Sequence, residues 1–369
     1  MSIDTEALNQ IFDELRKSAT RITPDATTKK RRGVGSTPKN ASRVESRDDI
    51  IRDLRSYLKE RKLVLVLGAG CGYDFQLPNW KQLLERLLIR TMADKPDLTT
   101  ELSTLFQISF SPDHLMLGRY LQDYYEATSA SFSEGVREAL YNEYEKKIGK
   151  GKKSLKSALM DEIVALCKRH PDRPDSIIST NFDDILESRL KGVIDYCSIY
   201  REGQFAKETE LAIYHVHGFL PRTGAIPEDN RITFGETVYH EQYSDIYSWS
   251  NLVQIFKFSN HHCLFIGTSL TDPNTRRLLD VSRKAKGKAH IPHYTFKERF
   301  DISKVKKDII EKLDHGIMEM NDDFTDKLAQ QLTEFAYAFY DSDFASLGVR
   351  TIWVDSINEI PEILNQIRQ

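Results

Sequence analysis

The sequence predicts an α/β protein built on a Rossmann-like, doubly wound and mainly parallel sheet. Short apolar, often β-branched runs alternate along the chain with longer segments of helical periodicity, which is the pattern of repeated strand–helix–strand units. The run LVLVLGAG at residues 63–70 is apolar up to its closing glycines, as in a strand buried on both faces. This alternation and the glycine-terminated first strand together indicate the fold class.

Five apolar runs predict strands, and the segments between them predict helices. We expect strands near residues 63–67, 176–180, 212–216, 263–267 and 350–354, and a further apolar run occupies residues 290–296. Helical spacing of apolar residues occurs in segments that include residues 50–62, 79–90, 157–170 and 322–340. From about residue 92 to 172, helical patterns occur without a strong strand signal, which predicts a helical insertion.

Residues 1–47 differ in character from the rest of the chain. Leu8, Ile11, Phe12 and Leu15 share one face of a short predicted helix. The residues after it, including the basic run KKRR at 29–32, are rich in turn formers and charges and show no apolar period. We therefore expect an N-terminal helix with a flexible basic linker over 1–47, and a single α/β domain over 48–369 that carries the insertion.

Composition narrows the functional classes. The chain has 369 residues, 40% of them hydrophobic, and a formal net charge of -3, so it can bury a large core but lacks the basic excess of a dedicated nucleic-acid binder. Any contact with nucleic acid would be indirect or through the basic linker. The sequence shows neither a signal-peptide pattern nor an apolar run long enough to span a membrane, so we expect a soluble, cytoplasmic protein. No two of the four cysteines form a CxxC pair, which argues against a zinc ribbon: Cys71, Cys167, Cys197 and Cys263.

The strongest local motif is the glycine turn after the first strand. Gly68 and Gly70 let the backbone turn tightly and could present N–H groups to a phosphate, which favours a dinucleotide ligand. A hydride-transferring dehydrogenase would need a third glycine at position 73, where this chain has Tyr73. The alternative interpretation is a strand-to-helix turn without a ligand.

Four separated segments together indicate a family. The segments GAGCGYDFQLPNW (68–80), STNFDD (179–184), HVHG (215–218) and GTSLTDPN (267–274) occur in this order. The set resembles the sirtuin-like superfamily, and the resemblance extends over roughly residues 50 to 369. Two positions depart from the family pattern: Gly72 stands where serine is common, and Gln76 stands where glycine precedes the Leu-Pro pair.

The resemblance implies an NAD-consuming enzyme. This chain lacks the four paired zinc cysteines of the protein deacylases, so it resembles instead the bacterial branch whose members hydrolyse NAD, often in antiphage defence. NAD would then be the substrate and no metal would be needed. The implied NAD-binding residues are Gly68, Ala69, Gly70, Asp74, Pro78, Trp80, Thr180, Gly267, Thr268, Ser269 and Asp272.

The chemistry of glycosidic cleavage supports three candidate catalytic residues within these segments. The bond to nicotinamide breaks through an oxocarbenium-like transition state, and the neutral leaving group needs no general acid. Asn181 has the donor and acceptor needed to orient a ribose hydroxyl or a water, and Asp183 is the family position that grips the nicotinamide carboxamide. His217 is the candidate general base, because imidazole titrates near neutrality.

Each of these residues also has a structural interpretation. Asn181 and Asp183 precede a helical run, so either could be a helix cap. His215 and His217 lie on the same side of a strand and could invite a metal, but no third ligand is evident, and we assign His215 a packing or supporting role. Asp272 could contact a ribose hydroxyl or could begin a helix at an Asp-Pro turn.

The favoured function is therefore an NAD glycohydrolase that releases nicotinamide and ADP-ribose as a regulated, NAD-depleting defence effector. A non-catalytic module that binds NAD or an ADP-ribose derivative is the main alternative, and a protein deacylase is a further one. We expect a homo-oligomer, and the resemblance suggests a HerA-like translocase ATPase as a partner.

Overall fold

The computed structural model describes residues 46–91, 105, 113–128, 131–149, 155–169, 171–226, 230–313 and 322–369. The chain separates into two compact units. The larger unit comprises Ile51–His293 with Ile360–Gln369, and the smaller one comprises Met1–Ile50 with Tyr294–Glu359. The expected apolar stripe at residues 8–15 and the KKRR run at 29–32 lie outside the described residues.

Five parallel strands form the sheet of the larger unit. They are β1 (Leu63–Leu67), β2 (Ser176–Ser179), β3 (Tyr196–Ile199), β4 (Leu211–His215) and β5 (His262–Ile266). Their order across the sheet is β3-β4-β2-β1-β5, and every neighbouring pair is parallel. All residues of β1 are buried, which explains why this central strand is apolar throughout.

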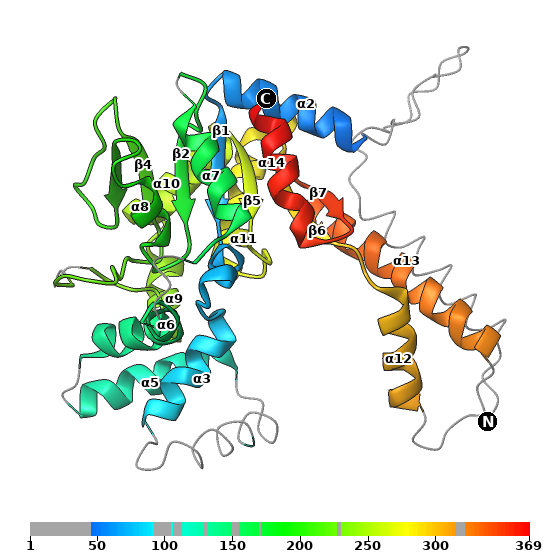
Figure 1. Cartoon of the computed structure of the whole chain (residues 1–369), viewed down its shortest axis with the longest axis horizontal. Coiled ribbons are helices and arrows are strands. Elements are labelled where there is room, and N and C mark those ends of the chain that lie inside the picture. The colour runs from blue at the N-terminus through cyan, green and yellow to red at the C-terminus, as the bar shows by residue number, and fades with distance from the viewer. Residues whose placement is uncertain are drawn as a thin grey trace. The chain divides into compact units, whose positions relative to one another are not determined.

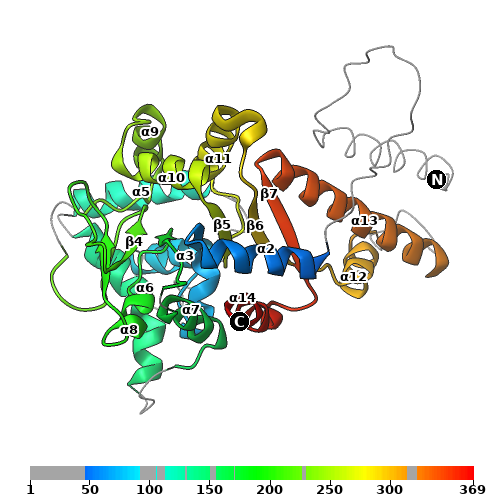
Figure 2. The same cartoon turned by 90° about the horizontal axis from the view of Figure 1, so that it is seen from above.

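Helices cover both faces of this sheet. Figure 2 shows α10 and α11 on one face of the strands and α7 and α8 on the other, which is the doubly wound arrangement that the sequence predicts. The bounds are α2 (Arg47–Lys59), α7 (Ala158–Lys168), α8 (Ile185–Leu190), α10 (Trp249–Asn260), α11 (Pro273–Lys286), a 3-10 turn η2 (Gly287–Ala289) and α14 (Ile360–Arg368).

A second group of helices lies beyond the carboxyl ends of the strands. The chain leaves β1 through a 3-10 helix, η1 (Ala69–Phe75), and enters α3 (Trp80–Thr91). Figure 1 shows α3 grouped with α5 (His114–Ala127), α6 (Phe132–Ile148) and α9 (Glu236–Ser244) at this end of the strands. The helices α5, α6 and α7 fall within the stretch 92–172, where the sequence predicts a helical insertion.

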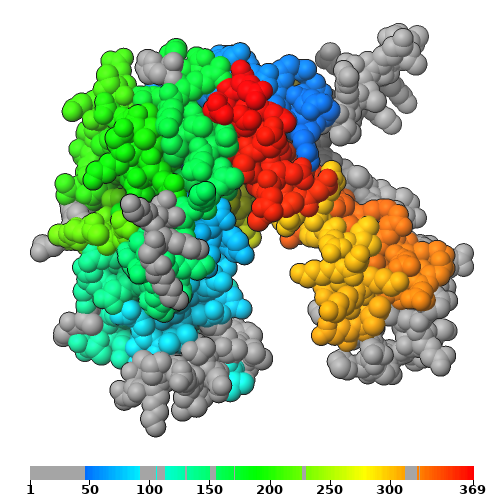
Figure 3. Space-filling view, viewed as in Figure 1, coloured from blue at the N-terminus to red at the C-terminus, as the bar shows by residue number. Residues whose placement is uncertain are grey.

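The smaller unit contains two strands, β6 (His293–Glu298) and β7 (Val349–Val354), two helices, α12 (Ile302–Leu313) and α13 (Asp322–Ser346), and a 3-10 turn, η3 (Ile357–Glu359). The first residue of β6, His293, is assigned to the larger unit. β6 and β7 are neighbours in the sheet order, and Figure 3 shows α12 and α13 packed side by side. A half-buried aromatic cluster lies between its elements: the Tyr337 and Trp353 rings lie 4.7 Å apart and the Phe300 ring packs on both.

The five predicted strands are confirmed, and the structure adds two more: β6, which lies in the apolar run at residues 290–296, and β3. β3 was not predicted, because its four residues, YCSI, are mostly half-buried and lie at the edge of the sheet, so they do not form an apolar run. Within the described residues, no helix is long and apolar enough to cross a membrane.

Candidate functional site

A cavity of about 740 Å³ lies at the carboxyl ends of the central strands of the larger unit. We call it the central cavity. This is where ligands bind in open α/β sheets. Except for Asp74, which is exposed on η1, all the predicted site residues line it: Gly68, Ala69, Gly70, Pro78, Trp80, Thr180, Asn181, Asp183, His217, Gly267, Thr268, Ser269 and Asp272.

The glycine turns after β1 and β5 pack directly against each other. A Cβ added to Gly68 would lie 2.7 Å from the Gly267 carbonyl oxygen, and one added to Gly267, whose φ is +68°, would lie 2.6 Å from the Cys71 nitrogen. The N–H groups of Gly68 and Gly70 donate to the carbonyls of Ile266 and Gly267 at 2.9 and 2.8 Å. These two N–H groups are therefore engaged within the protein, and the glycines are required by the contact between two loops rather than by phosphate donation.

Asn181 is held at the end of β2 by hydrogen bonds to two neighbouring loops. Its side-chain Nδ2 donates to the Gly68 carbonyl at 3.0 Å, and its backbone carbonyl lies 3.2 Å from Nδ1 of His215. The side chain is not a helix cap, so the capping interpretation is wrong for this residue. The bond to Gly68 uses one amide hydrogen, and within the described residues Oδ1 and the second hydrogen remain available to a ligand.

Asp183 combines a structural role with a place in the cavity. Its Oδ1 accepts a hydrogen bond of 3.1 Å from the N–H of Ile185, the first residue of α8, so the predicted helix-end role is present. Burial raises the pKa of the Asp183 carboxyl to about 6, although the bond from Ile185 opposes the shift. A carboxyl that titrates near neutrality while lining a cavity is typical of a functional site.

His217 has an unpartnered ring nitrogen. The residue is 8% exposed, and its Nε2 has no hydrogen-bond partner among the described residues. Burial lowers the pKa of His217 below its ordinary value, against the opposing effects of the Asp272 charge and a hydrogen bond with the Thr180 backbone. The imidazole is therefore neutral at physiological pH. A nitrogen lone pair that accepts no hydrogen bond from the protein is what a general base needs.

Both carboxylate oxygens of Asp272 accept hydrogen bonds from the protein. Asp272 caps α11 by accepting from the N–H of Thr275 at 2.6 Å, and its other oxygen accepts from the Tyr239 hydroxyl at 2.7 Å. The helix-start interpretation of the Asp-Pro pair is therefore confirmed. Burial opposes ionisation, but His217 and these hydrogen bonds hold the pKa of Asp272 below its ordinary value.

The remaining residues of the β5 turn also bond to each other. Thr268 Oγ1 accepts from the Leu270 N–H, and the hydroxyl groups of Ser269 and Thr271 lie 2.7 Å apart. Ser269 is exposed, so its hydroxyl can still reach a ligand.

The sequence reasoning missed several residues at the site. Tyr239 reaches the cavity from α9, and Lys81 and His114 line it from α3 and α5. Tyr141 of α6 anchors the loop after β2, because its hydroxyl lies 2.9 Å from the Leu220 carbonyl and accepts from the Asp184 N–H. None of these side chains belongs to a local motif, so only the tertiary fold identifies them.

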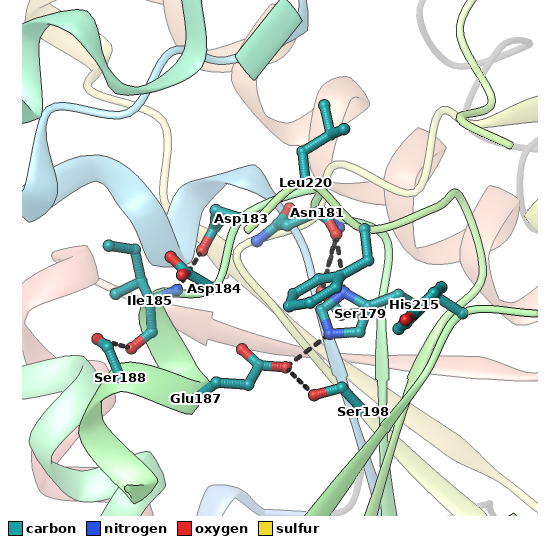
Figure 4. Close-up of polar contacts among 12 residues, drawn as sticks. Ser179, Asn181, Asp183, Asp184, Ile185, Glu187, Ser188, Ser198, His215 and Leu220 are labelled. Carbon is teal, nitrogen blue, oxygen red and sulfur yellow. Dashed lines mark hydrogen bonds and ion pairs between the residues drawn. The ribbon is translucent and has the colours of Figure 1, made fainter. Parts of the chain in front are cut away.

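His215 forms a buried pair with Glu187 beneath the loop of Asn181. Figure 4 shows the His215 ring between the two partners, with Nε2 2.6 Å from Glu187 Oε1 and Nδ1 facing the Asn181 carbonyl. The sequence indicates a supporting role for His215 but does not identify Glu187. Among the described residues, no group of three or more His, Cys, Asp or Glu side chains is arranged to hold a metal.

Part of the chain matches a known family. Residues 175–317 match the SIR2-like domain. The matched range contains Asn181, Asp183, His217 and the β5 turn, whereas the glycine turn after β1 precedes it. The match supports a relationship to the sirtuin-like superfamily, and because SIR2-like domains are typically NAD-dependent enzymes, it indicates an NAD-related activity.

Proposed function

We propose that this protein is an NAD glycohydrolase that cleaves the bond between nicotinamide and ribose. The observation that carries the proposal is the meeting of three different groups in one cavity: the Asn181 amide, the Asp183 carboxyl and the unpartnered Nε2 of His217. A cavity of about 740 Å³ falls within the size range of cofactor sites. Lys81 adds a positive charge that suits a ligand bearing phosphates.

The reaction requires positioning more than acid catalysis. The C–N bond to nicotinamide breaks, its electron pair leaves with the neutral nicotinamide, and positive charge develops on the ribose. The oxygen of a water molecule bonds to the anomeric carbon and the water loses a proton, so the products are nicotinamide, ADP-ribose and a proton. His217 accepts this proton on Nε2, either from the water directly or through a ribose hydroxyl.

Asn181 and Asp183 contribute orientation and charge. The free polar atoms of Asn181 orient the ribose hydroxyl or the attacking water, because the bond to Gly68 fixes the side chain in one direction. When ionised, Asp183 accepts from the carboxamide N–H of nicotinamide through the oxygen that does not bond Ile185, and its charge favours the cationic transition state.

An assay of NAD products tests the proposal. The full-length protein is incubated with NAD, with an acylated peptide, and with both, and the products are separated by chromatography. We expect nicotinamide and ADP-ribose from NAD alone. Nicotinamide that appears only in the presence of the peptide would indicate a deacylase, and NAD that binds without being cleaved would indicate a regulatory module.

The NAD level inside cells provides a second measurement. An enzyme that depletes NAD must be kept inactive until a trigger is present. The resemblance to defence effectors supports a trigger that acts through oligomerisation or a partner. We expect cellular NAD to fall on expression of the wild type under inducing conditions and to stay constant with Asn181→Ala.

The oligomer that we expect can be tested separately by light scattering. An unchanged mass after deletion of residues 1–47 would rule out the N-terminal segment as the oligomer contact.

A further inference from the structure

The buried pair of Glu187 and His215 lies outside the reacting groups, but it touches the chain that carries one of them. Glu187 projects from α8 and His215 is the last residue of β4, and they are 6% and 1% exposed. The Ser198 hydroxyl of β3 donates to the same Glu187 oxygen at 2.9 Å. Side chains from α8, β4 and β3 therefore form one hydrogen-bonded cluster, and His215 connects this cluster to the Asn181 carbonyl (Figure 4).

The partners of the His215 ring determine its protons. A carbonyl oxygen faces Nδ1 at 3.2 Å and a carboxyl oxygen lies 2.6 Å from Nε2. The carbonyl can only accept, so Nδ1 must carry a hydrogen, and a second hydrogen must lie between Nε2 and Glu187. An imidazolium beside a carboxylate and a neutral imidazole beside a carboxylic acid both satisfy this count, and both contain the same number of protons.

Loss of one proton breaks this arrangement. With a single hydrogen left for the two contacts, a nitrogen lone pair must face an acceptor oxygen, either at Asn181 or at Glu187. Because Glu187 is the charged partner, the remaining hydrogen stays on Nε2, and the bond to the Asn181 carbonyl is lost. The support of the Asn181 loop thus depends on a proton held by the pair.

The surroundings of the pair favour the protonated form. The Asp183 carboxyl and the Cys71 thiol line the same small cavity of about 10 Å³ as the pair. Burial raises the pKa of the Tyr196 phenol, and the nearby Glu187 adds to this shift. Burial alone lowers the pKa of His215, but Glu187, the Asn181 carbonyl and Asp183 together raise it above the ordinary value.

We propose that Glu187 and His215 are positioning residues that hold Asn181 in its working orientation, and that they do so only while the pair keeps its shared proton. The kinetic consequence rests on the proposed NAD hydrolysis, whereas the protonation of the pair does not. Turnover of NAD should therefore fall at alkaline pH, as the pair loses its proton and the Asn181 loop loses a support.

Two matched variants test the positioning role. In Glu187→Gln, the side-chain N–H₂ can donate to Nε2 of a neutral His215, whose Nδ1–H still bonds Asn181, so both contacts survive without the carboxylate. We expect kcat near neutral pH within about threefold of the wild type and no alkaline loss due to the pair. Adding His215→Phe removes the bond to Asn181 while keeping a ring beside Phe219, and should lower kcat by about tenfold or more with little change in KM.

Ser198→Ala is the control, because it removes one bond to Glu187 and leaves the pair intact. It should keep the alkaline loss of the wild type. A double variant with the kcat of Glu187→Gln, or a Glu187→Gln protein with an unchanged alkaline loss, would overturn the proposal.

A spectroscopic measurement separates this proposal from that of NAD hydrolysis. In full-length protein labelled with ¹⁵N-histidine and ¹⁵N-phenylalanine, His215 should show a proton on Nδ1 at neutral pH, and the backbone amide of Phe182, which shares the peptide group with the Asn181 carbonyl, should titrate with it. In Glu187→Gln that amide should not titrate over the same range. A bare Nδ1 in the wild type overturns the proposal, whereas absence of NAD cleavage with the expected spectra contradicts only the proposed reaction.

Discussion

The two sides of the central cavity use their polar groups differently. On the side of β1 and β5, the N–H groups of Gly68 and Gly70 and both oxygens of Asp272 already have protein partners. On the side of β2 and β4, Asn181 retains unbonded amide atoms and Nε2 of His217 has no partner among the described residues. The first side therefore builds the cavity, and the second side holds the groups that can react. Substitutions on the two sides should consequently differ in kind.

The largest expected effect is on turnover, from the β2 and β4 side. His217→Ala and Asn181→Ala should each lower kcat for NAD by ~10²–10⁴-fold, because each removes a group that acts mainly in the transition state. NAD affinity, measured by calorimetry, should change far less. Cleavage at the wild-type rate by both folded variants, under conditions in which the wild type is active, would show that the site assignment is wrong.

On the β1 and β5 side we expect a loss of stability. Gly267→Ala places a Cβ 2.6 Å from the Cys71 nitrogen at a φ of +68° and should lower the free energy of unfolding by about 2 kcal/mol or more. Gly203→Ala is the matched control, because its φ is +79° but nothing lies within 4 Å, and it should cost about 1 kcal/mol. Urea denaturation measures both. If the free energy of unfolding falls equally in the two variants, the contact between the loops after β1 and β5 does not contribute to stability.

Asp183 should show opposite effects on stability and activity. Burial raises its folded pKa to about 6, above the value in the unfolded chain, so folding takes up a proton between about pH 4 and 6. The ionised carboxyl therefore destabilises the fold above pH 6, and below pH 4 this effect disappears. We expect Asp183→Asn to unfold at a higher temperature than the wild type at pH 8, with a smaller difference at pH 4.

Turnover should change in the other direction in Asp183→Asn. Wild-type kcat should rise with pH as the carboxyl ionises near pH 6, and the variant should lack this rise and turn over NAD more slowly at pH 8. A pH profile of nicotinamide release measures it. A profile that is the same in both proteins would exclude ionised Asp183 from the reaction.

The smallest effect is expected at Tyr239, whose hydroxyl reaches Asp272 from α9. Tyr239→Phe removes the 2.7 Å hydrogen bond to Asp272 but leaves the bond between Asp272 and Thr275 in place. The free energy of unfolding should therefore fall by about 1 kcal/mol, and turnover should fall by less than about tenfold. Tyr247→Phe is the control, because Tyr247 is 79% exposed, and thermal unfolding should not detect it. A loss of turnover as large as that of His217→Ala would place Tyr239 among the reacting groups.

The amino-acid sequence is sufficient to predict the strands with clear apolar runs and the segments that end at the cavity, but not the edge strand β3. Apolar runs of strand length are local, and so are the turns that follow them, so Gly68 is predicted from its own segment. Asn181, His217 and Gly267 are implied by the resemblance of four segments to the sirtuin-like superfamily. The two alternative roles of Asp272, ligand contact and helix start, are also predicted from neighbouring residues, because a helix cap bonds a residue three positions away.

Tertiary structure decided how each of these groups is used. The engagement of the Gly68 and Gly70 N–H groups, the hydrogen bond from Tyr239 to Asp272 and the pair of Glu187 with His215 join residues that are 28 or more positions apart. Such contacts leave no local pattern, since hydrogen bonding and burial depend on distances in space. The same physics lowers the pKa of His217 and raises that of Asp183, because burial acts on a group through neighbours that its own sequence segment does not contain.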